Sequence, residues 1–351
     1  MERAHVLVRL RGDASVSGAA GICRTSATTV RLEHSEMSPG VASITFEQVF
    51  DVDDSNTCVF QTSLTDAVDA VVDGKAATLI ATGATNSGKS FACHGDHHKQ
   101  SNGKAEPGLI TLAIRRVFSD LETKLQSGVK CNVLLSCWGV ARSELSEQEA
   151  LTDLLSTGTY VDAPVEDMEQ VLLNNAMVVS THAEAVHLYS KALANVKKVE
   201  KQDFVIALHV ETLSPHGEAR RGRLLIMDLH GGAIVEPQGD TNKVEKKERL
   251  QCFLDTQFPV NKVLSAGFGA FVGNTSATYL LVTIQTPAQF QQQAIQSLLY
   301  ACKAKEIKSS SLVNFLPAFV KRNNHGCTFE TQKRPSSISE SQTAGCSEDY
   351  V

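Results

Sequence analysis

The residues with the clearest potential for chemistry form one continuous stretch that reads G-x-x-x-x-G-K-S. They are Gly83, Ala84, Thr85, Asn86, Ser87, Gly88, Lys89 and Ser90. In such a phosphate-binding loop the glycines let backbone N–H groups approach phosphate oxygens, the lysine neutralises the charge of the β- and γ-phosphates, and the last hydroxyl holds Mg²⁺. The stretch therefore predicts a site for a nucleotide with Mg²⁺. The alternative is a chance turn rich in glycine and serine.

The segments around this stretch support the first interpretation. Residues 77–81 are apolar and β-prone, so a buried strand leads directly into the loop, as the motif requires. A second buried strand, residues 224–229, ends in D-x-x-G with Asp228 and Gly231. A carboxylate at a strand end suits a water-mediated contact to Mg²⁺, and the glycine offers an N–H to a γ-phosphate. We therefore add Asp228 and Gly231 to the nucleotide-binding residues, with Ser90 and Asp228 as the Mg²⁺ residues. The alternative for Asp228 is a plain turn residue.

The composition excludes several other classes of protein. The chain has 351 residues, 42% hydrophobic and 21% charged, with a net charge of −6. This balance is ordinary for a globular protein and gives no basis for binding nucleic acid. Nine cysteines, odd in number and without a C-x-x-C pair, indicate free thiols in a reducing compartment. No apolar run reaches membrane-spanning length and no leader pattern opens the chain, so we expect a cytoplasmic protein without a membrane partner.

Strand and helix patterns alternate along the chain. Helical spacing of apolar residues predicts helices over residues 64–72, 109–125, 144–156, 182–196 and 288–308. Strands are predicted over residues 5–11, 77–81, 131–138, 204–211, 223–229 and 279–285. This order with a phosphate loop predicts an α/β fold of the P-loop NTPase class, a central sheet with flanking helices. Residues after 320 are polar and predicted to be disordered.

Several motifs, in one order along the chain, resemble those of kinesin motor domains. They are I-T-F-E-Q-V-F at residues 44–50, the loop itself at 77–90, F-A-C-H-G at 91–95, P-G-L-I at 107–110, D-L-H-G-G-A at 228–233, G-N-T-S-A-T at 273–278 and L-Y-A-C-K-A-K-E-I-K at 299–308. The resemblance covers about residues 4–308. It implies a motor domain over residues 1–308 with a mixed sheet of eight strands and helices on both faces, and a neck-linker-like segment with a tail over residues 309–351.

The resemblance also implies ligands and partners. ATP or ADP with Mg²⁺ would occupy the loop, microtubules (tubulin) would be the track, and the location would be the cytoskeleton. Arg9 and Arg11 stand in the R-x-R-P strand end that contacts the base, although Gly12 replaces the proline. A second kinesin-like chain is a further partner that the family implies.

Two parts of the family pattern for hydrolysis are missing. Kinesins carry N-x-x-S-S-R-S-H between the helix and the strand that match residues 182–196 and 204–211, whereas here Asn195 is followed by V-K-K-V-E-K-Q-D. The arginine of that segment pairs with a glutamate at the position of Ala233. Both halves of the ion pair are therefore absent in this alignment, and we expect hydrolysis to be weakened by orders of magnitude. The alternative is a switch segment shifted along the chain. No catalytic residue is assigned.

The region that carries the microtubule-docking helix in kinesins is short here. It retains basic residues that suit the acidic surface of tubulin: Lys243, Lys246, Lys247, Arg249 and Lys262. The alternative is a solvated helix face, since Glu245 and Glu248 are interleaved with them. His94, His97 and His98 are interpreted as a solvated loop rather than a metal site. Two functions remain: a kinesin-type ATPase, or an inactive binding module acting as a partner or adaptor on microtubules.

Overall fold

The computed structural model describes residues 2–12, 21–32, 42–96, 105–142, 149–156, 160–161, 167–196, 202–230, 267–310, 312–320, 322–323 and 326–327.

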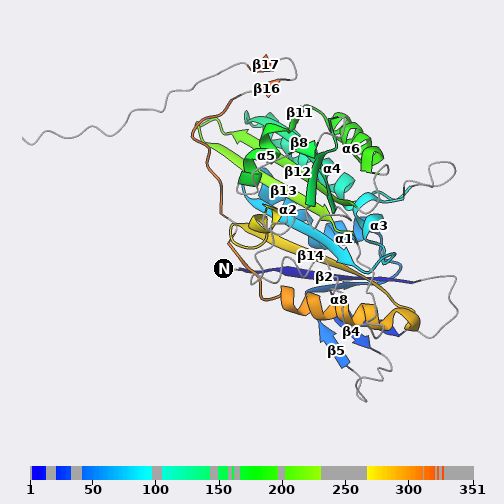
Figure 1. Ribbon diagram of the computed structural model, residues 1–351. Helices are drawn as coiled ribbons and strands as arrows, with labels where there is room; N and C mark the ends of the chain where they lie inside the picture. Colours follow the sequence, from blue (N-terminus) through cyan, green and yellow to red (C-terminus); the bar gives the residue numbers. More distant parts are fainter. Residues whose placement is uncertain are drawn as a thin grey trace, which may run out of the picture.

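A mixed β-sheet forms the centre of the part of the chain that is described (Figure 1). Its strands, in spatial order, are β10 (Tyr160–Val161), β9 (Glu149–Asp153), β8 (Lys130–Arg142), β12 (Gln202–Leu213), β13 (Ala219–Asp228), β7 (Ala76–Gly83), β14 (Ser276–Gln285), β2 (His5–Arg11) and β6 (Gln48–Phe50), with β11 (Met177–Val179) paired to β8. The predicted mixed sheet is confirmed. Among the described residues it has ten strands rather than eight, and three of the ten are very short: β10 has two residues, and β6 and β11 have three each.

The pairing directions bring several strand ends to one edge of the sheet. β7 runs parallel to β13 and β14, and β14 runs parallel to β2. The register places Asp228 opposite Ala81, Thr283 opposite Gly83 and Gln285 opposite Arg11. Because parallel strands end on the same side, the carboxyl ends of these four strands meet there, which is where open α/β sheets bind ligands.

Helices cover both faces of the sheet (Figure 1). One face carries α1 (Asn56–Ser63), α2 (Thr65–Val72), α3 (Lys89–His94), α4 (Leu109–Gln126) and α6 (His182–Val196). The other carries α5 (Met168–Asn174), α8 (Gln291–Ala304), the 3₁₀ turns η3 (Phe268–Phe271) and η4 (Ala288–Phe290), and a small sheet of β3 (Ile22–Ser26), β4 (Thr29–Leu32) and β5 (Ala42–Thr45). On β13, Leu224 and Ile226 enter the first core while Leu225 and Met227 enter the second, as alternation along a strand requires.

Most predicted helices are confirmed within a few residues, and three short helices, α1, α3 and α5, were missed. The predictions at residues 64–72, 109–125 and 182–196 correspond to α2, α4 and α6, and the one at 288–308 to η4 and α8, which end at Ala304. α1 was missed because its sequence is mostly polar. It begins where the Ser55 hydroxyl accepts a hydrogen bond from the backbone N–H of Cys58 at 3.0 Å. This is an ordinary serine N-cap.

The helix predicted over residues 144–156 is wrong. Residues 149–153 form β9, which pairs antiparallel with β8. The apolar side chains have helical spacing, but they serve different sides of the sheet: Leu151 lies in one core, and Leu154 and Leu155 lie in the other. The spacing therefore arises from a strand followed by a turn between two cores rather than from one helix face.

The segment after α8 returns along the body of the domain. β1 (Glu2–Arg3) pairs with β15 (Lys308–Ser309). Residues 312–320 then lie against the start of β13 and the turn before β7: the N–H of Asn314 donates to Gly74 O at 2.8 Å, and the N–H of Leu316 donates to Ala219 O at 2.8 Å. Beyond lie β16 (Arg322–Asn323) and β17 (Gly326–Cys327). The tail predicted to be disordered falls mostly outside the described residues.

An ionic cluster around the buried side chain of His209 lies beside α5, on the β12–β13 pair. His209 is fully buried, with Nε2 at 3.4 Å from Glu169 Oε1, and Arg223 forms an ion pair with the same glutamate. Burial lowers the pKa of His209 below its ordinary 6.5. Burial alone would raise the pKa of Glu169, but His209 and Arg223 outweigh it and lower that pKa to about 2.

This cluster predicts that the fold loses stability in acid. Folding lowers both pKa values. As the pH falls through about 6.5, His209 takes up its proton more readily in the unfolded chain than in the folded one, and Glu169 does the same below about pH 4.5. The free energy of unfolding, measured in urea, should fall between about pH 7.5 and 5, and His209→Gln should flatten that fall. His216→Gln, at an exposed turn, is the matched control. Equal pH slopes for both variants would contradict the assignment to His209.

Candidate functional site

The predicted phosphate loop joins the end of β7 to the start of α3. Gly83, Asn86 and Gly88 have positive φ angles of 137°, 63° and 104°. This left-handed backbone favours glycine, and asparagine is among the few other residues that adopt it readily. At Gly88 the one atom of the described residues that an added Cβ would meet within 4 Å is the Arg11 Cδ, at 3.3 Å. The loop therefore turns tightly while leaving room beside the first residues of α3, where phosphate groups bind.

The lysine of the loop points into the loop itself. Lys89 is buried, and its Nζ donates to Gly83 O at 3.0 Å and to Ala84 O at 2.7 Å. The Ser87 hydroxyl lies 2.6 Å from the Thr283 hydroxyl, which fastens the loop to β14. Charge-assisted hydrogen bonds from an ammonium to an anion such as phosphate are stronger than those to neutral carbonyls. The loop thus presents a fixed positive charge that suits a phosphate.

The structure brings Ser90 and Asp228 into contact. The Ser90 hydroxyl donates to Asp228 Oδ2 at 2.8 Å, which joins the start of α3 to the end of β13. Asp228 is buried, and within the described part of the chain its Oδ1 has no hydrogen-bond partner. A buried carboxylate oxygen without a donor is costly. A hydroxyl, a carboxylate and an unpaired acceptor beside a phosphate loop are the oxygen ligands that Mg²⁺ and its waters take, so these residues fit the nucleotide–Mg²⁺ group.

Arg9 and Arg11 both lie at the carboxyl end of β2, but they face different partners. The Arg11 guanidinium donates to the Asn86 carbonyl and so touches the loop directly. The Arg9 guanidinium is buried, donates to the Asn56 side chain and to Asp54 O at 2.9 Å, and lies 5.3 Å from the centre of the Phe91 ring. Burial lowers the pKa of Arg9. The structure thus places Arg9 beside the start of α1 and against α3.

Asn56 is a residue at this site that the sequence interpretation missed. It is fully buried, and its side-chain Nδ2 donates to Phe91 O and to Pro107 O, both at 3.0 Å. It therefore holds α3 to the chain that enters α4, while its Oδ1 holds Arg9. The only sequence signal was its place in a polar run just after Ser55, which reads as a helix cap rather than as a bridging residue.

His94 is the second missed residue, and its interpretation as part of a solvated loop is wrong. It ends α3, is buried, and lies with Nε2 at 3.2 Å from Asp228 Oδ2 and Nδ1 at 2.6 Å from the Tyr189 hydroxyl. No group of three or more metal-ligating side chains occurs among the residues described. His97 and His98 fall outside that part of the chain.

Other predicted site residues also fall outside the described residues. They are Gly231, Lys243, Lys246, Lys247, Arg249 and Lys262, together with Ala233. The described part of β13 and its exit ends at His230, whose N–H donates to Asp203 Oδ1 at 2.6 Å. Asp203 therefore holds the chain at the third residue of the D-x-x-G segment.

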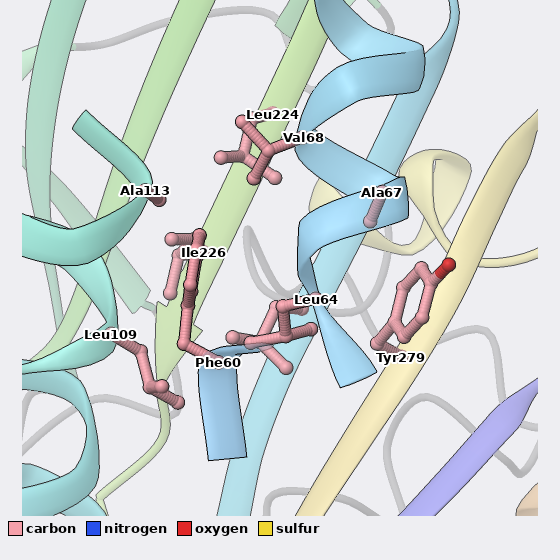
Figure 2. A pocket seen from close by; sticks show the side chains of 10 residues that line it. Phe60, Leu64, Ala67, Val68, Leu109, Ala113, Leu224, Ile226 and Tyr279 are labelled. Carbon is pink, nitrogen blue, oxygen red and sulfur yellow. The ribbon is translucent and has the colours of Figure 1, made fainter. Parts of the chain in front are cut away.

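An apolar cavity in the core is separate from this site. It lies between α1, α2, α4 and the strands β7, β13 and β14, and Figure 2 shows the side chains that line it, among them Leu64, Ile226 and Tyr279. Its free volume is about 10 Å³, the size of a single water, and a cavity with an apolar lining stays dry. No residue of the phosphate loop lines it. It is a packing defect of the core rather than a ligand site.

Comparison with known families identifies the domain that carries this site. The family model described as "Kinesin motor domain" matches residues 11–252 of the chain. The chain belongs to the kinesin motor domain family. No helix in the described residues is both long and apolar enough to span a membrane.

Individual kinesins are similar at low identity. "Kinesin-like protein 3" of Schizosaccharomyces pombe is 24% identical over 315 residues, which cover 82% of this chain and 54% of the relative. "Kinesin-related protein 13" of Dictyostelium discoideum is 23% identical over 296 residues, covering 77% of this chain and 23% of the relative. The chain thus spans about half or less of the length of these relatives. A solved structure titled as that of a fast kinesin superposes with a TM-score of 0.70 at 17% identity, covering 92% of this chain and 96% of the other.

Proposed function

We propose that this kinesin-family chain binds ATP or ADP with Mg²⁺ at the loop of residues 83–90. The observation that carries the proposal is the Ser90–Asp228 contact at 2.8 Å beside a loop built around the buried ammonium of Lys89. Lys89 would meet the β- and γ-phosphates, the loop N–H groups would surround them, and Arg11 lies where it would close over the loop. Bound Mg²⁺ would supply charge neutralisation between the phosphate oxygens, with Ser90 and Asp228 as its protein residues.

The nucleotide is proposed to be hydrolysed slowly. Phosphoryl transfer needs groups that position water and spread the developing charge. The S-S-R-S-H segment of kinesins does not occur in this sequence, and alanine stands at position 233 in the place of the family's glutamate. The nucleotide-binding residues are therefore retained while the water-positioning residues are absent, and the proposal is a site that holds nucleotide longer than a fast motor does.

Microtubules are the proposed track or platform, and the cytoskeleton the proposed location. The family supports this assignment, and the basic residues Lys243, Lys246, Lys247, Arg249 and Lys262 are the proposed contacts to tubulin. Residues 309–320 are proposed to act as a neck-linker-like segment, because their backbone bonds to Gly74 and Ala219 fix them along the body of the domain. The second candidate function is an inactive adaptor or partner of another kinesin-like chain, which the same two sequence departures favour.

The variant Ala233→Glu tests the proposed loss of the switch ion pair. Since the arginine partner is also absent, the new glutamate should leave steady-state ATP turnover within about twofold of wild type. Turnover is measured by phosphate release at saturating ATP, with ADP affinity measured beside it as the check that the site is intact. A rise of about 100-fold would show that a shifted arginine fulfils the role and that the alignment is wrong.

A further inference from the structure

The two oxygens of the Asp228 carboxylate have different surroundings. Oδ2 accepts from the Ser90 hydroxyl at 2.8 Å and lies 3.2 Å from His94 Nε2. Oδ1 is buried and, among the residues described, has no hydrogen-bond partner. Oδ2 therefore has two hydrogen-bonding partners within the protein, whereas Oδ1 remains available to accept a hydrogen bond from a ligand or water. Such an arrangement fixes the orientation of a carboxylate, because rotating it would leave two donors unpaired.

Tyr189 determines which nitrogen of His94 carries the proton. The Tyr189 hydroxyl lies 2.6 Å from His94 Nδ1, and burial raises the pKa of this phenol, so it stays protonated. A buried phenol must donate its hydrogen, and Nδ1 is its hydrogen-bond partner among the described residues. The ring then carries its own hydrogen at Nε2, which points at Asp228 Oδ2. The chain of donors runs from Tyr189 through His94 to the carboxylate.

Packing holds the two rings in this arrangement. The Phe204 ring on β12 lies edge-on to both, with centroids at 5.1 Å from His94 and 6.0 Å from Tyr189. Tyr189 belongs to α6, His94 to α3 and Asp228 to β13. Three separate elements therefore meet at the carboxylate, and none of the three aromatic or imidazole rings can turn without losing these contacts.

We propose that His94 and Tyr189 are positioning residues for the Mg²⁺ site, which orient Asp228 so that Oδ1 is left to accept from a magnesium-bound water. This rests on the proposed binding of nucleotide with Mg²⁺ at the loop. Partners behind a metal-binding carboxylate typically change metal affinity about 10- to 100-fold when they are removed. His94 and Tyr189 should therefore set how much Mg²⁺ strengthens nucleotide binding, and leave the binding of metal-free nucleotide unchanged.

The test compares ADP affinity in Mg²⁺ with ADP affinity in EDTA, using a fluorescent ADP analogue and the full chain. The ratio of the two dissociation constants is the contribution of Mg²⁺. His94→Ala should lower this ratio about tenfold while the EDTA value stays within about twofold of wild type, and Tyr189→Phe should lower it about threefold. His94→Gln keeps an N–H donor at the same reach and should restore most of the ratio. His187→Ala, exposed on the same helix as Tyr189, is the matched control.

The outcomes separate this inference from the proposed function. A wild-type ratio in His94→Ala overturns the positioning role while nucleotide binding stands. Equal weakening in Mg²⁺ and in EDTA, without rescue by His94→Gln, indicates a merely structural role and also overturns it. A wild-type chain that binds ADP in neither condition overturns the proposed function, and the inference with it.

Discussion

Replacing Lys89 with alanine is expected to weaken the affinity for MgADP by about 100-fold, the equivalent of about 2.7 kcal/mol. The Lys89 ammonium is buried and lies at 3.0 and 2.7 Å from the carbonyls of Gly83 and Ala84. It is the charge in the loop that a β- or γ-phosphate would meet. The measurement is a titration with a fluorescent ADP analogue, and thermal unfolding confirms that the variant is folded.

Lys124→Ala is the matched control for Lys89→Ala. Lys124 lies on α4 and pairs at the surface with Asp73, Nζ to Oδ1 at 2.7 Å. Surface ion pairs contribute little, so this variant should bind MgADP as wild type does. The role assigned to Lys89 would be contradicted if Lys89→Ala bound MgADP within about threefold of wild type, since removing a lysine that binds phosphate should reduce the affinity more than that.

Gly83→Ala is expected to give the largest loss of stability, about 3 kcal/mol in the free energy of unfolding. Gly83 has a φ of 137°, and an added Cβ would lie 2.2 Å from the Thr283 carbonyl oxygen and 2.8 Å from the Ser87 hydroxyl. Overpacking costs about 1–3 kcal/mol, and the left-handed backbone adds about 1–2 kcal/mol for a residue with a Cβ. Urea unfolding measures the loss, and nucleotide affinity should fall with it because the loop starts at this residue.

Gly217→Ala separates the two causes. Gly217 also has a positive φ, of 88°, but within the described part of the chain an added Cβ would meet nothing within 4 Å. Its substitution should therefore show the backbone cost alone, about 1 kcal/mol. The difference in the free energy of unfolding between the two variants is the energetic cost of the steric clash between residue 83 and Thr283 of β14. Equal losses in the free energy of unfolding would mean that β14 shifts to accommodate the new methyl group, and that the close approach of Gly83 to Thr283 does not add to the destabilisation.

The sequence predicted the parts of this domain whose patterns are local and consistent. The phosphate loop stands between β7 and α3 as the motif requires, and α2, α4, α6 and the β12–β13 hairpin lie where apolar periodicity and turn residues placed them. The meeting of Ser90 with Asp228, 138 residues apart in the chain, was also expected. Two separate motifs in the sequence assign both residues to one Mg²⁺.

The errors arose where contacts between distant elements decide the outcome. Leu151, Leu154 and Leu155 have helical spacing, yet they serve two cores on opposite sides of the sheet. His94 looked like the first of three loop histidines, and only the fold shows that Tyr189 and Asp228 enclose it. Asn56 gave no signal of a bridging role, since its three partners come from separate parts of the chain. A single sequence does not carry such side-chain networks.

The central claim is that the chain retains nucleotide binding while its hydrolysis is weakened. The most direct test is ATP turnover by the purified chain, with and without microtubules, beside Lys89→Ala. We predict turnover below about 0.1 s⁻¹ under both conditions, at least about 100-fold under the typical enzyme value of about 10 s⁻¹, with MgADP binding that Lys89→Ala weakens about 100-fold. Fast turnover that microtubules stimulate and Lys89→Ala removes would contradict the claim and establish a working motor.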